Sequence, residues 1–254
     1  MSERVGVLHP GAMGAAVGAL LRAAGHDVVW ASAGRGPQTR ARAEAAGLTD
    51  AGRIDALAAR ASVILSVCPP HAALEMARTV AAAGFRGVYV DANAVSPATA
   101  RRIAGILPGV VDGGIVGSPP AKAGTTRLYL SGPGADAVAA LFAGTVLECR
   151  RLEGPVGAAS ALKMAYAAWS KGSAALLLTA RALAEAEGVG PALLAEWRPG
   201  GVDAQWAQAQ GSAESKGWRW VGEMEEIAAS MASAGLPDGF HRAAAEVYRA
   251  YPRT

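Results

Sequence analysis

The sequence predicts an α/β fold in which a doubly wound parallel sheet is followed by an all-helical C-terminal domain. Short β-branched or aromatic runs at residues 4–8, 27–31, 62–68 and 87–91 alternate with Ala- and Leu-rich stretches of helical length. This alternation is typical of βαβ units and a parallel sheet. Strand signals cease near residue 150. We therefore expect two domains, residues 1–150 and 151–254.

Further elements follow from the same signals. Residues 109–112 and 127–131 extend the predicted sheet, and residues 146–149 are a candidate closing strand. The stretch 156–187 is rich in Ala and Leu and contains no proline, which predicts one long helix. Helices are also predicted at 191–198, 218–233 and 238–250, because Gly- and Pro-containing breaks at 199–201 and 235–237 separate them.

Composition restricts the class of protein. The chain has 254 residues, of which 52% are hydrophobic and 18% charged, so a compact globular protein is expected. Its 24 basic and 21 acidic residues are interspersed, which argues against nucleic-acid or membrane-surface binding. Two cysteines and four scattered histidines predict neither a disulfide framework nor a metal site. Because no secretory signal or apolar span is evident, a cytoplasmic location is expected.

A glycine turn follows the first predicted strand and precedes a predicted helix. Glycine allows the backbone to approach a pyrophosphate, and the N-terminus of the helix offers N–H groups to the anion. The position of the turn favours a Rossmann-type dinucleotide site over a plain structural turn. The residues that would bind the cofactor here are His9, Pro10, Gly11, Ala12, Met13 and Gly14, with His9 replacing the first glycine of the usual pattern.

The end of the second strand favours NADP over NAD. An NAD site normally has an acidic residue here to accept from the ribose 2′-hydroxyl, but residues 31–32 contain none. Ser32 and Arg35 instead suit a 2′-phosphate. Arg40 and Arg42 are expected to face solvent on a helix. Cys68 and Pro69 end another strand at the carboxyl edge of the sheet, where cofactors bind, although Cys68 is not expected to be a reactive thiol.

Four ordered motifs resemble those of the β-hydroxyacid dehydrogenase superfamily, which includes 6-phosphogluconate and 3-hydroxyisobutyrate dehydrogenases. They are residues 10–14, 91–97, 112–119 and 154–163, and the likeness is greatest to a short branch with a small helical C-terminal domain. The resemblance implies a nicotinamide-dependent oxidoreductase and adds Asn93 to the cofactor site. Ala167 stands where the family usually has asparagine, and Asn93 and Ala94 stand where serine and threonine are common.

Lys163 is the candidate catalytic residue. It is one of only four lysines, lies in an otherwise apolar predicted helix, and resembles the family's catalytic lysine. We expect Leu162, Met164 and Tyr166 to surround it and suit it to general acid/base catalysis, although a lysine at the helix surface would fit the same spacing. The candidate substrate-binding residues are Ser96, Gly117, Ser118, Tyr166 and Ser170.

The sequence therefore predicts an NADP-dependent dehydrogenase or reductase acting on a small hydroxy or oxo acid or a related carbonyl compound. Two alternatives remain: an imine reductase, and a non-catalytic NADP-binding protein of the same fold. We also expect a homodimer, because a long Ala-rich helix at 156–187 cannot bury all its faces in so small a domain.

Overall fold

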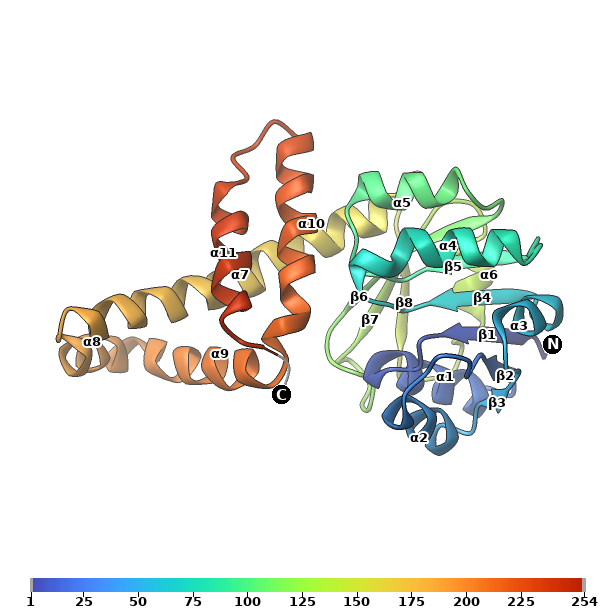
Figure 1. The fold of residues 1–254 in the computed structure, drawn as a ribbon, viewed down its shortest axis with the longest axis horizontal. Coiled ribbons are helices and arrows are strands. Elements are labelled where there is room, and N and C mark those ends of the chain that lie inside the picture. The colour runs from blue at the N-terminus through green and yellow to red at the C-terminus, as the bar shows by residue number, and fades with distance from the viewer. Residues whose placement is uncertain (1, 253–254) are drawn as a thin grey trace. The chain divides into compact units, whose positions relative to one another are not determined.

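The computed structural model describes residues 2–252 and divides into two compact units, one ending at Lys163 and the other beginning at Met164 (Figure 1). The division falls inside the long helix α7 (Ala158–Ala186). The change from strands to helices lies near residue 150, as the sequence indicates, but the first turns of α7 pack with the sheet.

Within residues 2–252, eight strands form one sheet in the order β3-β2-β1-β4-β5-β6-β7-β8. The part β3-β2-β1-β4-β5-β6 is parallel and has the strand order of doubly wound dinucleotide-binding folds, with the order reversing between β1 and β4. The strands are β1 (Arg4–Leu8), β2 (Asp27–Trp30), β3 (Thr49–Asp50), β4 (Val63–Ser66), β5 (Val88–Asp91), β6 (Val110–Val116), β7 (Arg127–Ser131) and β8 (Glu148–Arg151).

The parallel arrangement does not extend to the last two strands. β7 runs antiparallel to β6, and β8 is parallel to β7. The reason lies in the connection, because residues 117–126 contain no helix and a short link can return the chain only in the opposite direction. β8 forms an edge with charged residues, which disfavours pairing with another sheet.

Helices cover both faces of the sheet. One core cluster joins α1 (Ala12–Ala23), α2 (Pro37–Ala45) and α6 (Ala135–Ala140) to the sheet, and a second joins α3 (Ile54–Arg60), α4 (Ala73–Ala82) and α5 (Pro97–Ala104). A short 3₁₀ helix, η1 (Pro70–Ala72), precedes α4. Figure 1 shows α4 and α5 on one side of the strands and α1 and α2 on the other. The Rossmann-type fold class is confirmed.

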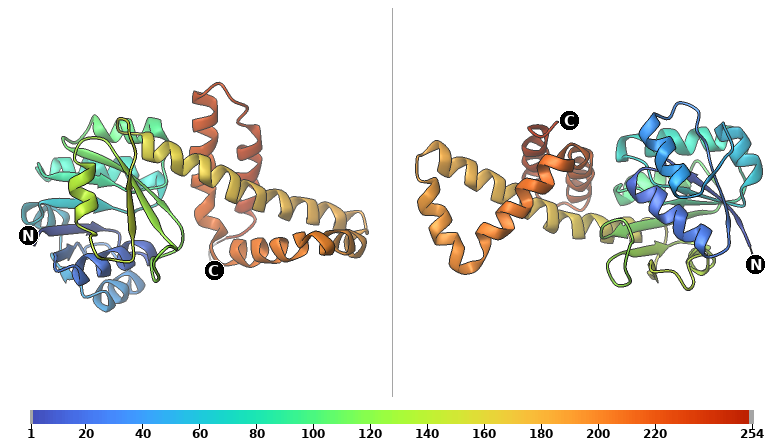
Figure 2. Two further views of the ribbon diagram at one scale, coloured as in Figure 1. Left: turned by 180° about the vertical axis from the view of Figure 1, so that it is seen from behind. Right: turned by 90° about the horizontal axis from the view of Figure 1, so that it is seen from below.

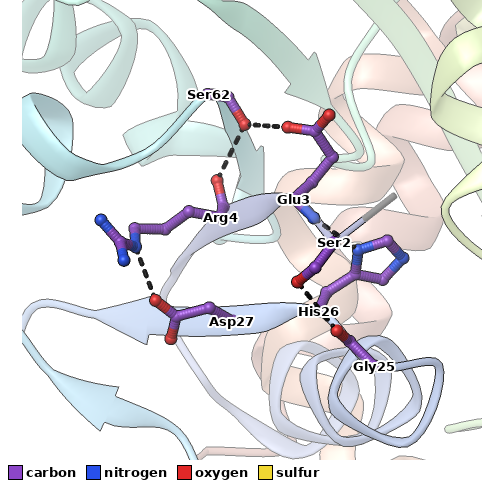
Figure 3. A network of polar contacts seen from close by, with 7 residues as sticks. All are labelled: Ser2, Glu3, Arg4, Gly25, His26, Asp27 and Ser62. Carbon is purple, nitrogen blue, oxygen red and sulfur yellow. Dashed lines mark hydrogen bonds and ion pairs between the residues drawn. The ribbon is translucent and has the colours of Figure 1, made fainter.

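Polar contacts tie the amino ends of three strands together (Figure 3). The Arg4 guanidinium is 2.5 Å from the Asp27 carboxylate, and the Glu3 N–H donates to His26 Nδ1 at 3.1 Å. Ser62, just before β4, donates to the Glu3 carboxylate at 2.6 Å. These contacts occupy the edge of the sheet opposite to the one where the predicted site residues lie.

The second unit is helical throughout its regular structure. After α7 come α8 (Gly190–Trp197), α9 (Val202–Lys216), α10 (Trp220–Ser233) and α11 (Gly239–Arg249), with short 3₁₀ turns η2 (Arg198–Gly200) and η3 (Gly217–Arg219). α10 and α11 lie side by side (Figures 1 and 2). The unit contains an ion pair between half-buried Lys171 and buried Glu223, and Tyr248 Oη donates to the Lys171 carbonyl at 2.7 Å. No helix in residues 2–252 has the length and apolarity that a bilayer span needs.

Candidate functional site

The carboxyl edge of the sheet brings most of the predicted site residues together. Parallel neighbours β1, β2, β4, β5 and β6 end at this edge, so the segments that follow them are adjacent. The segments are the glycine turn after β1, Ser32 after β2, Cys68 and Pro69 after β4, Asn93 and Ser96 after β5, and Gly117 and Ser118 after β6.

The glycine turn has the shape of an anion cradle. The Gly11 N–H donates to the His9 carbonyl at 2.7 Å, and a Cβ atom at Gly14 would lie only 2.6 Å from that oxygen. α1 begins at Ala12 without a side-chain cap and without an acidic residue in its first turn. Its first N–H groups are therefore suited to a phosphate. Pro10 is buried, and Met13 packs against the core beneath the turn.

His9 and Arg35 contribute buried polar atoms beside this turn. His9 has a left-handed backbone with φ of 58°, the conformation that the missing glycine would adopt easily. Burial, assisted by the nearby Arg35 charge, lowers the pKa of His9 to about 4. His9 Nδ1 and Arg35 Nε are buried without a hydrogen-bond partner among residues 2–252. Two such atoms at one place are well suited to a polar ligand group.

Cys68 lies near Arg35 and is not poised to act as a nucleophile. Burial is the main cause that raises the pKa of its thiol to about 12. The thiol therefore stays protonated near neutral pH, in agreement with the sequence expectation. The Cys68 N–H donates to Asn93 Oδ1 at 2.6 Å, so this residue contributes to the shape of the loop after β4, and Pro69 next to it is exposed.

A carboxylate that sequence reasoning missed lies beside the segment after β2. Asp50, at the end of β3, is partnered in register with Trp30 of β2. Although partial burial opposes the effect, hydrogen bonding from Ser32 and from the Gly52 N–H holds the pKa of Asp50 below its ordinary value. Asp50 comes close to Ser32 only because β3 pairs with β2, and this pairing could not be predicted from the sequence. Ser32 is thus engaged with a carboxylate.

Arg40 does more than face solvent, in contrast to the sequence expectation. Its Nη2 donates to the Ser32 carbonyl at 2.9 Å, and its Nε donates to the Arg35 carbonyl at 3.2 Å. Both acceptors belong to the turn that presents Arg35. Arg40 therefore fixes the backbone of this turn, while remaining exposed itself.

Asn93 and Ser96 are buried, and their side chains serve the local structure. Asn93 Nδ2 donates to Ser66 Oγ at 3.1 Å and to Asp91, while its Oδ1 accepts from the Cys68 N–H. Ser96 caps α5 by accepting from the Thr99 N–H at 3.2 Å. These residues position the loops of the carboxyl edge, and their cofactor and substrate contacts stay predictions.

The connection after β6 places Gly117 and Ser118 differently. Gly117 has φ of 118°, and a Cβ atom there would lie 2.3 Å from the Thr125 carbonyl oxygen, so the turn requires glycine. Ser118 is exposed, and its carbonyl accepts from Thr126 Oγ1 at 2.6 Å. The Ser118 hydroxyl therefore lies on the surface of a turn whose backbone is fixed.

Lys163 belongs to the first unit and lies against β6. A Cβ atom at Gly114 would be 2.7 Å from the Ala159 carbonyl oxygen and 3.1 Å from Lys163 Cβ. Glycine at this position thus lets α7 contact the strand directly. Because Gly114 lies two residues before the end of β6, the backbone of Lys163 is held near the carboxyl edge.

The apolar surroundings predicted for Lys163 are only partly present. Met164 is buried, but Leu162 is 36% and Tyr166 47% exposed, and Lys163 itself is half-buried. The reason is that successive residues of a helix point in different directions. Tyr166 and Ser170 belong to the second unit, where both are exposed.

Comparisons with known proteins bear on the fold of the chain. The family model described as "Domain of unknown function (DUF1932)" matches residues 184–251, and no curated protein matches the chain. A conserved protein of unknown function, whose structure was described as similar to 3-hydroxyacid dehydrogenases, is 28% identical with a TM-score of 0.69, and the match covers 97% of both chains.

Two enzymes share the fold at lower identity. Mycobacterium tuberculosis 3-hydroxyisobutyrate dehydrogenase, solved with L-serine, is 19% identical with a TM-score of 0.71, and the match covers 99% of this chain and 94% of that one. An Aspergillus terreus reductive aminase, solved with NADPH and ethyl-5-oxohexanoate, is 21% identical with a TM-score of 0.60, covering 98% and 94%. The structural neighbours of this chain are 3-hydroxyisobutyrate dehydrogenase-like proteins, and its own fold is that of the hydroxyacid dehydrogenases.

Proposed function

We propose that this protein is an NADP-dependent oxidoreductase that interconverts a small hydroxy acid, or a related alcohol, and its oxo form, with Lys163 as the general acid/base. One observation carries the proposal. The direct contact of α7 with Gly114 holds Lys163 near the edge of the sheet where the glycine turn lies. A proton-transfer group and a dinucleotide cradle are thus presented by one compact unit.

The residues of the first unit fit a nicotinamide dinucleotide. The N–H groups at the start of α1, which have no side-chain cap, would hold the pyrophosphate, and Gly14 is required there because a Cβ atom would collide with the His9 carbonyl oxygen. Arg35 would bind the 2′-phosphate, supported by its buried Nε without a partner among the described residues. The bound cofactor would supply or accept the hydride.

Lys163 would move the proton that accompanies hydride transfer. In the direction of reduction, its ammonium donates a proton to the substrate oxygen as the carbonyl becomes a hydroxyl. In the direction of oxidation, its neutral amine takes that proton back. Ser118 and the N–H groups of its turn would bind the carboxylate of the substrate.

Reduction of an imine is the second candidate. It is favoured by the structural neighbours, which include a reductive aminase and a Streptomyces aurantiacus imine reductase with a TM-score of 0.54. Lys163 favours the first candidate, because a carbonyl oxygen must gain a proton as it receives hydride, whereas an imine that is already protonated does not.

The test is a turnover assay with NADPH and a panel of small oxo acids, aldehydes and ketones, each with and without an added amine. Oxidation of NADPH by carbonyl compounds alone is the expected result. Oxidation only when an amine is present would assign imine reduction. Binding of NADPH without turnover on any member of the panel would contradict both enzymatic proposals and leave a binding protein.

A further inference from the structure

Asp112 lies at the centre of a buried polar row that crosses the sheet. Ser66, Asp91, Asp112 and Ser131 are partners in register on β4, β5, β6 and β7, and the side chains of all four are fully buried. A carboxylate in such a place is costly unless hydrogen bonds compensate it. The contacts of Asp112 therefore indicate what this residue stabilises.

The partners of Asp112 are mostly groups at the start of α7. Its Oδ2 accepts from the Gly157 N–H at 2.8 Å and from the Ser160 N–H at 3.0 Å, and its Oδ1 accepts from Ser160 Oγ at 2.5 Å. A negative charge at the N-terminus of a helix also interacts favourably with the helix dipole. Asp112 thus supplies from a strand the cap that α7 needs.

Ser131 adds a second link between the sheet and the helix. Its Oγ donates to Asp112 Oδ2 at 3.0 Å and accepts from the Ala159 N–H at 3.0 Å. Together, Asp112 and Ser131 bind the N–H groups of Gly157, Ala159 and Ser160. These hydrogen bonds hold the first turn of α7, whose N–H groups have no partner within the helix, against β6 and β7.

The hydrogen bonds from the start of α7 to Asp112 and Ser131 also determine where Lys163 lies. Lys163 follows Ser160 by three residues, about 4.5 Å along the helix axis and close to the same helix face. Gly114, two residues after Asp112 on β6, is where α7 contacts the strand beside Lys163. A shift or rotation of the first turn would therefore move the amine along the carboxyl edge.

We propose that Asp112, assisted by Ser131, is a positioning residue for Lys163, acting by fixing the register of the first turn of α7 on β6. The proposal rests on the proposed function, because the position of Lys163 affects turnover only if Lys163 transfers the proton. Misplacement of a reacting group by about 1 Å can reduce turnover about 100-fold. Loss of the Asp112 contacts should then reduce kcat about 10- to 100-fold, with KM for NADPH unchanged.

The first experiment needs no substrate. The full chain contains only four lysines, at 122, 163, 171 and 216, so protein labelled with ¹³C at lysine Cε gives a simple NMR spectrum. The Lys163 signal is assigned by its loss in Lys163→Arg. In Asp112→Asn and Ser131→Ala, we expect the Lys163 signal to shift or split while the Lys122 and Lys216 signals remain.

Two further variants control for misfolding and for a general loss of stability. Ser131→Ala keeps the Asp112 charge and decides the question if Asp112→Asn does not fold. Val138→Ala removes buried methyl groups from α6, on the other face of the sheet, and controls for a general loss of stability. An unchanged Lys163 signal in folded Ser131→Ala, or the same change in Val138→Ala, would overturn the proposal.

Turnover separates the positioning role from the proposed function. If the wild-type protein oxidises NADPH with a member of the carbonyl panel, kcat should fall in the order wild type, Asp112→Asn, Asp112→Ala, with KM for NADPH constant. Equal kcat per folded molecule in all three would overturn the positioning role. If the wild-type protein shows no turnover, the proposed function fails, whereas the NMR result still decides whether Asp112 sets the place of Lys163.

Discussion

His9 combines a left-handed backbone with a partly buried ring, and both features affect stability. A non-glycine residue in this conformation costs about 1–2 kcal/mol, so His9→Gly should stabilise the protein by about 1 kcal/mol at neutral pH, allowing for the greater entropy of the unfolded glycine chain. Urea unfolding at pH 7 measures this gain. No gain would indicate that contacts of the ring offset the backbone strain.

The lowered pKa of His9, about 4, also predicts a pH dependence. In the unfolded chain this ring binds a proton near pH 6.5, whereas the folded protein keeps it neutral down to about pH 4. The free energy of unfolding should therefore fall as the pH drops from about 6.5 to about 4, and this contribution levels off below. His9→Asn, which tolerates the left-handed backbone and does not titrate, should lack this part of the slope. An identical slope in both proteins would contradict the prediction.

Arg35 is expected to distinguish the two nicotinamide cofactors. Arg35→Ala should weaken NADPH binding by about 1–3 kcal/mol, the value of a charge-assisted hydrogen bond, and leave NADH binding unchanged. Titration calorimetry with both cofactors measures the difference. Arg60→Ala, which removes one positive charge from the exposed end of α3, is the control. Equal losses for NADPH and NADH would show that Arg35 does not read the 2′-phosphate.

At the scale of single residues, the sequence identified types and positions but not partners. The roles of Gly11 and Gly14 could be predicted, because a turn of this kind requires glycine at these positions in any protein that contains it. The carboxylates of Asp50 and Asp112 were not, since their partners come from other strands or from residues 45 and 48 positions away. For Asn93 and Ser96, the structure adds hydrogen bonds that position the loops at this edge, and their predicted ligand contacts stay predictions.

Among the elements, α7 carries an exposed apolar stripe that fits the expected homodimer. Leu162, Trp169, Leu176 and Leu183 recur at intervals of seven residues, and Trp169 is 77% exposed. Such a repeat forms a continuous seam along a helix, and exposed apolar seams of this kind usually pack against another helix. We propose that a second copy of the chain covers it.

Light scattering at micromolar concentration should therefore give the mass of a dimer. The double variant Leu176→Asp/Leu183→Asp should be monomeric, because two buried carboxylates without partners would oppose association. Ala229→Asp, at an exposed position of α10, should remain dimeric. A monomeric wild-type protein would refute the proposal.

Regular elements were predicted where pattern and length were strong. The strands β1, β2, β4, β5 and β7 and the helices α7, α8, α10 and α11 lie within a few residues of their expected bounds. β3 was missed because it has only two residues, too few to show the alternation of apolar and polar residues that indicates a strand. α9 was missed because its sequence consists mainly of polar residues and alanine, and its buried residues are only Ala209 and Ala213.

For the whole molecule, the order of strands explains why the fold was predictable and the site only in part. Parallel strands joined by helices bring their carboxyl ends to one edge, so segments that follow strands could be assigned to a common site from sequence. The contacts of each side chain at that edge depend on how the strands pair, as in the row from Ser66 to Ser131. This pairing joins segments that are distant in sequence, so no local sequence pattern predicts it.

The central claim is that Lys163 transfers the proton, and single-turnover kinetics of Lys163→Ala with the best substrate of the carbonyl panel tests it most directly. The variant should bind NADPH nearly as well as wild type, because the proposed cofactor site consists of the glycine turn and Arg35 and does not include Lys163. Hydride transfer should be slower by about 10²–10⁴. Lys163→Arg should not restore it, since a guanidinium retains its proton, whereas Lys216→Ala should behave as wild type. Hydride transfer at the wild-type rate in Lys163→Ala would contradict the account and make Lys163 a structural residue.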